Sequence, residues 1–137
     1  MKSISIFKDY STENFNIANN LIFNCFYEVK FERVFACFWD NDCNIKCFRL
    51  INEGKNAFFN IDIDKILYFA QKVDCKNIAI ASNHLFLQNR DIKIINKEIE
   101  TVSKIKSKLK ENNLNLCDII LYHKNNLYTT FSEINFI

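Results

Sequence analysis

The chain has 137 residues, of which 49% are hydrophobic and 25% charged, and it contains 14 Phe, one Gly and no Pro. These proportions exclude a disordered chain and predict one globular domain over residues 1–137. The net charge of +2 is too small to indicate nucleic acid or an anionic membrane by itself. No apolar run approaches the roughly 20 residues of a membrane helix, and no signal peptide is recognisable, so we expect a cytoplasmic protein with its cysteines as thiols.

The first half of the chain predicts a helix, two strands and a second helix. Apolar residues recur at three- and four-residue steps over 11–30, which predicts an amphipathic helix beginning at Ser11 or Thr12. The run RVFACFW, 33–39, is β-branched and aromatic and predicts a strand buried on both faces. After a turn, the alternation over 45–51 predicts its antiparallel partner, followed by a loop that holds Gly54. Residues 62–75 then predict a helix.

The second half adds three strands and one long helix. NIAIA, 77–81, predicts a strand, and residues 92–112 predict a basic helix with apolar residues at helical spacing. Residues 116–122 and 127–131 predict two further strands separated by a turn. The order α-β-β-α-β-α-β-β predicts the α/β (α+β) class, with a mixed sheet and helices packed on it.

Particular residues occur at marked places in this order. FERVFACFWD puts Glu32 just before the first strand and Asp40 at its end, and Gly54 follows fourteen residues later. The third strand runs into Ser82-Asn83-His84, and Asp118 lies in LCDIILY. This series resembles the RadC-like branch of the JAB/MPN (JAMM) metalloprotease family. Members of that branch carry a Glu, Leu-Asp, Gly-Thr, His-Asn-His-Pro-Ser-Gly and Asp-His in the same order.

The resemblance covers roughly residues 11–134, and it is ungapped from Glu32 to His84. It implies a JAB/MPN-like, cytidine-deaminase-like fold of three layers, a mixed sheet flanked by helices on both sides. It also implies a zinc site, because family members bind zinc through two His and one Asp and use the Glu as general base.

The residues that the family needs for zinc have largely changed. His84 matches the second His, but Ser82 replaces the first, and a serine hydroxyl is a poor zinc ligand. The Asp ligand falls on Ile95 without gaps, on Glu98 if three residues are inserted, and Asp91 is a third candidate. The resemblance therefore implies a degenerate metal-binding motif, in a domain that kept the fold and lost the metal.

Apolar residues replace the polar rim of the family's site. Leu85, Phe86 and Leu87 stand where the family has Pro-Ser-Gly. We expect Phe86 and Leu87 either to fill the vacated pocket or to contact a partner. Ser82 and Asp118 are further candidate binding residues.

Three functions remain open. The first is a pseudoenzyme: a catalytically degenerate RadC-like JAB/MPN domain that binds or scaffolds a protein partner, without a cofactor. RadC-like proteins are traditionally associated with DNA repair, a label that comes with the resemblance. The second is a zinc-dependent peptide or isopeptide hydrolase with an altered ligand set, in which Glu32 is the base and His84 with Glu98 or Asp91 binds the metal. The third is a nucleic-acid-associated protein that uses the basic helix 92–112. A homodimer is compatible with each.

Simpler interpretations exist for each of these residues. Glu32 is expected to be a solvated glutamate at a helix-to-strand junction, and His84 a hydrogen-bonded structural residue. The lysines of helix 92–112 are expected to form a solvated face that Glu98 and Glu100 interrupt. Cys43 and Cys47 form one loose pair, whereas a structural zinc site needs two.

Overall fold

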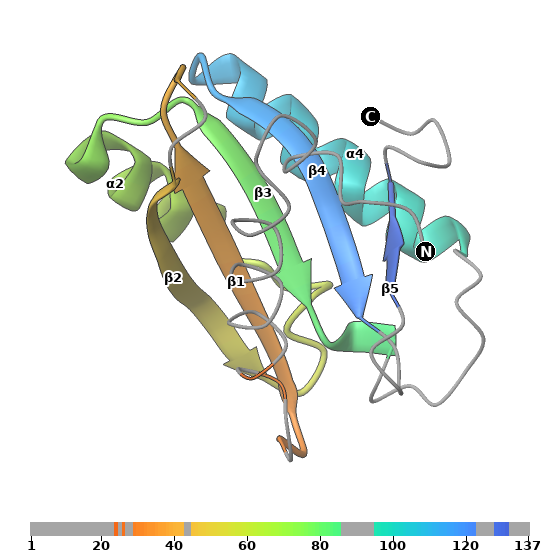
Figure 1. Ribbon diagram of the computed structural model, residues 1–137. Helices are drawn as coiled ribbons and strands as arrows, with labels where there is room; N and C mark the ends of the chain where they lie inside the picture. The colour runs from red at the N-terminus through yellow and green to blue at the C-terminus, as the bar shows by residue number, and fades with distance from the viewer. Residues whose placement is uncertain are drawn as a thin grey trace.

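The computed structural model describes residues 24, 26, 29–42, 45–85, 95–122 and 128–131. In chain order its elements are β1 (Glu32–Trp39), β2 (Ile45–Gly54), α2 (Ile63–Val73), β3 (Asn77–Ser82), α4 (Asn96–Glu111), β4 (Asn115–Tyr122) and β5 (Tyr128–Thr130) (Figure 1). Most of the helix expected over 11–30 lies outside the described residues, and Val29 and Lys30, which are described, are not helical.

The described strands form one mixed sheet of five strands in the order β2-β1-β3-β4-β5. β3 and β4 pair in parallel, and the other neighbours pair antiparallel. The predicted mixed sheet and α/β class are therefore confirmed. Helices α2 and α4 pack against the same face of the sheet (Figure 1). A helical layer on the opposite face was also expected, and the described residues do not test that part of the prediction.

β1 lies inside the sheet and is buried on both faces, as its composition predicts. Val34, Ala36 and Phe38 point toward α2 and α4 and join the larger apolar core. The alternate residues Phe35 and Trp39 belong to a second core on the opposite face. Because successive side chains of a strand point to opposite faces, this central strand needs apolar residues at nearly every position.

β2 is longer than the sequence predicts. The strand was expected to end at residue 51, but it continues through Asn52 and Glu53 to Gly54, which pairs with Glu32. Glu53 also accepts a 3.0 Å hydrogen bond from Arg33 Nε. β2 is at the edge of the described sheet, where polar side chains remain exposed, and its polar end was therefore mistaken for a loop.

The described helices are shorter than predicted at both ends. Asp62 precedes α2 and its carboxylate accepts the Lys65 N–H at 3.1 Å, while Asp74 ends the helix in the left-handed conformation. α4 begins after Ile95 rather than at residue 92, which lies outside the described residues together with 93 and 94. No described helix is both long and apolar enough to cross a membrane.

Candidate functional site

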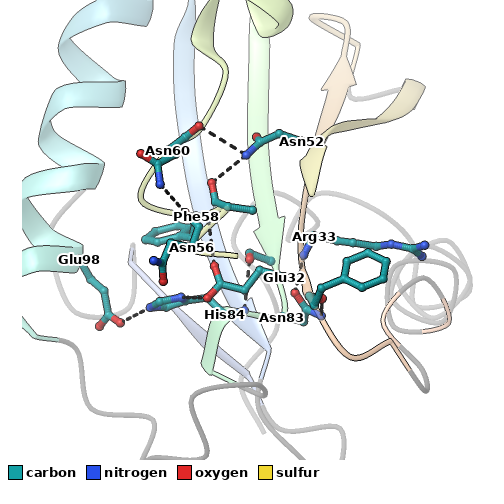
Figure 2. Close-up of polar contacts among 12 residues, drawn as sticks. Glu32, Arg33, Asn52, Asn56, Phe58, Asn60, Asn83, His84 and Glu98 are labelled. Carbon is teal, nitrogen blue, oxygen red and sulfur yellow. Dashed lines mark hydrogen bonds and ion pairs between the residues drawn. The ribbon is translucent and has the colours of Figure 1, made fainter. Parts of the chain in front are cut away.

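Three titratable side chains from distant parts of the chain meet at one end of the sheet. Glu32 begins β1, His84 follows β3, and Glu98 lies in the first turn of α4 (Figure 2). β1 and β3 are antiparallel, with Val34 opposite Ser82, so the start of β1 lies beside the end of β3. We call Glu32, His84 and Glu98 the Glu–His–Glu cluster.

Each ring nitrogen of His84 faces a carboxylate. Nδ1 lies 3.0 Å from Glu32 Oε2, and Nε2 lies 2.7 Å from Glu98 Oε2. Both distances are those of hydrogen bonds. The exposed fraction is 4% for Glu32 and 0% for His84 and Glu98. Solvent therefore does not reach the imidazole in this conformation.

Backbone N–H groups hold the second oxygen of each carboxylate. Phe58 N–H donates to Glu32 Oε1 at 3.0 Å, and Ile95 N–H donates to Glu98 Oε1 at 3.0 Å. The Ile95 contact completes the amino-terminal turn of α4, where the helix dipole also favours a negative charge. Both carboxylates are thus fixed from two sides, which suits a rigid site rather than a mobile general base.

Two aromatic rings enclose the imidazole. Phe58 stacks on His84 with ring centroids 5.0 Å apart, and Phe59 meets it edge-on at 4.7 Å. Lys97 Nζ lies 4.3 Å from the centroid of the Phe59 ring. His84, Phe59 and Lys97 therefore form a sequence of contacts from the buried cluster to the exposed surface of α4.

The two contacts of the imidazole determine how many protons the cluster holds. An ionised carboxylate and an unprotonated ring nitrogen are both acceptors, so each contact needs one proton. Either His84 carries both protons, or one of them lies on Glu32 or Glu98. In both cases the cluster keeps one net negative charge inside the protein, which the N–H groups of Phe58 and Ile95 face.

Of the other candidate residues, Ser82 contacts the cluster, Asp118 lies farther along the sheet opposite Ala79, and the rest lie outside the described part. Ser82 is buried, and its Oγ accepts the His84 N–H at 3.2 Å. Asp118 is buried in β4 and accepts the Ile119 N–H at 2.8 Å. The remaining candidates lie outside the described residues: Asp91, Phe86 and Leu87.

The geometry of His84 does not fit the zinc ion that the family resemblance implies. Zinc would have to replace a proton on one ring nitrogen, and two ligands of a tetrahedral zinc lie roughly 3.3 Å apart. Nε2 and Glu98 Oε2 are 2.7 Å apart, which leaves no space for a metal between them. Within the described residues, no group of three or more His, Cys, Asp or Glu side chains is arranged to hold a metal ion. The metal content of the protein stays a prediction.

The structure corrects two expectations for glutamates. Glu32 is not a solvated residue at a junction, because it is buried and bonded to His84 and to the Phe58 N–H. Glu98 does not interrupt an exposed basic face, because it points into the protein toward His84. A buried carboxylate needs hydrogen-bond partners. Both glutamates have His84 as a partner, 52 residues from Glu32 and 14 residues from Glu98, so the sequence did not reveal it.

Sequence reasoning overlooked the two phenylalanines. Phe58 and Phe59 lie between the expected loop that holds Gly54 and the expected helix 62–75, where no element was predicted, yet they enclose His84. An apolar pair within an otherwise polar connection was the available signal.

Comparison with known proteins gives no further assignment. No family model matches the chain, and no curated protein matches it.

Proposed function

We propose that the chain is a catalytically degenerate RadC-like JAB/MPN domain that acts as a binding or scaffolding module. Support for the family comes from the residue series beginning at Glu32 and from the mixed sheet that carries it. His84, at the histidine position of the resemblance, contacts Glu32 at the base position and also Glu98, which takes the acidic ligand position if three residues are inserted.

The observation that carries the non-catalytic role is the closure of His84. Both ring nitrogens are hydrogen-bonded to carboxylates, and the ring is buried between Phe58 and Phe59. A hydrolytic site needs a nucleophile and room for the scissile bond within hydrogen-bond distance of its base. Glu32 is 4% exposed, and each of its carboxylate oxygens already faces a protein group, so solvent water has little access to it as a base.

The experiment is elemental analysis of the protein purified without chelator and dialysed against trace zinc. We expect no zinc above background, and no cleavage of peptide or isopeptide substrates. A variant with His84→Ala serves as the matched reference, because any zinc bound at the cluster would be lost with the imidazole.

Bound zinc together with hydrolytic activity would support the alternative function, a zinc-dependent peptide or isopeptide hydrolase. About one zinc per chain, absent from His84→Ala, would show that the cluster rearranges to bind metal. Loss of any hydrolytic activity on Glu32→Gln would then assign the general base. Either finding would overturn the scaffold proposal.

A further inference from the structure

A pocket lies on the surface directly beside the Glu–His–Glu cluster. Its volume is about 300 Å³, and it lies between the segment that precedes α2 and one flank of α4. Its lining residues are Phe59, Asn60, Ile61, Ile63, Thr101, Lys104 and Ile105. Four of these are apolar, and two carry neutral polar groups. Such a volume is at the lower end for pockets that bind small molecules.

Lys104 is the only charged residue in this lining. Within the described residues no carboxylate lies within ion-pair distance of its ammonium group, whereas Lys108 on the same flank pairs with Glu111 at 3.8 Å. Lys97 is on this flank too, because residues 97, 101, 104 and 108 recur at helical spacing. The inner pocket thus combines an apolar surface with one unpaired positive charge.

Acidic residues line a second, wider hollow that shares three lining residues with the pocket. That hollow of about 530 Å³ shares Ile61, Ile63 and Lys104 with the pocket and adds Asp62, Asp64 and Glu111. Asp62 already accepts the Lys65 N–H at the start of α2. The acidic residues therefore do not line the smaller pocket, in which Lys104 is the only charged lining residue.

We propose that the inner pocket binds a small apolar carboxylate. Its hydrocarbon part would contact Ile61, Ile63 and Ile105, and its carboxylate would pair with Lys104 and accept the amide N–H of Asn60 that is not donated to Asn56 O. An anionic ligand gains a charge-assisted hydrogen bond at Lys104 that a neutral ligand of the same shape lacks. This inference deepens the proposed binding role and rests on it, by naming a class of ligand.

Phe59 connects this pocket to the buried cluster. Phe59 is one of the lining residues, and its ring packs edge-on against His84. A ligand in the pocket would contact one side of Phe59 while His84 contacts another. Binding is therefore expected to shift the ring resonances of His84, although the ligand does not touch the imidazole.

The test is an NMR titration of the full-length protein with 4-methylpentanoate, with 4-methylpentanamide as the neutral ligand of matched shape. We expect saturable shifts at Ile61, Thr101 and Ile105 and at the His84 ring. The amide should bind about tenfold more weakly, as should the carboxylate to Lys104→Met, because each change removes one charge-assisted contact. Lys106→Met is the matched control, since Lys106 is exposed on another flank of α4 and lines neither hollow.

Three outcomes would overturn the inference: no saturable shifts with the carboxylate, equal affinity for the amide, or equal weakening in Lys104→Met and Lys106→Met. None of these depends on metal content. Zinc found by elemental analysis would overturn the scaffold role but leave the pocket result intact, and a negative titration would leave the zinc result intact.

Discussion

Replacement of Glu98 by alanine removes one of the two carboxylates that hold His84. The change deletes the 2.7 Å contact to Nε2 and also the acceptor of the Ile95 N–H at the start of α4. His84 stays in a fully buried position with one nitrogen unpaired. Glu32 still faces Nδ1, so the cost is that of leaving the buried Nε2 and the Ile95 N–H without their partner, about 3–5 kcal/mol in total.

The two lost hydrogen bonds are part of that cost and are not added to it. Hydrogen bonds to charged groups contribute about 1.5–3 kcal/mol each, which agrees with the same total. Since domains of this size unfold with about 5–15 kcal/mol, the variant should lose a large fraction of its stability. If Glu98→Ala does not fold, Glu98→Gln should still do so, with a loss of about 1–2 kcal/mol, because the amide keeps one acceptor and one donor.

Urea denaturation followed by fluorescence provides the measurement. Trp39 is the only tryptophan and is buried in the sheet, so its emission reports unfolding. We expect the midpoint for Glu98→Ala to fall by about 2 M urea. Glu100→Ala is the matched control on the same helix, because Glu100 is exposed and should change stability by less than about 0.5 kcal/mol. Equal midpoints for the two variants would refute the reasoning that the cluster holds α4 to the sheet.

Two further predictions concern other parts of the fold. Burial, and secondarily the neighbouring Cys47, raise the pKa of the Cys37 thiol from 9.0 to about 12. Native protein at pH 8 should therefore leave Cys37 unalkylated while Cys47 reacts, as mapped by mass spectrometry, and labelling of both at one rate would contradict this. The stability that Cys37 contributes is fully present below pH 9.0 and is lost as the pH rises toward about 12. Gly54 has φ +124°, and no atom lies within 4 Å of a Cβ added there. Gly54→Ala should therefore lower the free energy of unfolding by about 1–3 kcal/mol through backbone strain alone. An unchanged thermal midpoint would argue against that strain.

The sequence predicts the described strands well because their side chains are buried in a simple pattern. β1 shows this most clearly: it contacts apolar groups on both faces, and its residues are apolar at nearly every position. The end of β2 was missed for the opposite reason. Asn52, Glu53 and Gly54 pair with β1 at the edge of the described sheet, where burial imposes no apolar pattern.

The candidate site is predictable only in part. The family resemblance offers Glu32, His84 and, with a three-residue insertion, Glu98, and the structure brings these three together. The resemblance does not predict that a carboxylate hydrogen-bonds to each ring nitrogen of His84, because the position of Glu98 depends on where α4 begins. Local propensity alone extends α4 to residue 92, whereas the described helix starts after Ile95, where Glu98 accepts the backbone N–H.

The order in which the strands pair has a consequence for folding. β1 and β2 follow each other closely in the chain, so their pairing closes only a short loop, while the parallel β3–β4 pair requires the whole of α4 as a crossover. His84 is 52 residues from Glu32 and 14 from Glu98, so the cluster needs both the β1–β3 pairing and the packing of α4 against the sheet. Until α4 packs against the sheet, His84 lacks its Glu98 partner. Hydrogen exchange at the Phe58 and Ile95 amides would therefore follow the last cooperative step of folding rather than the first.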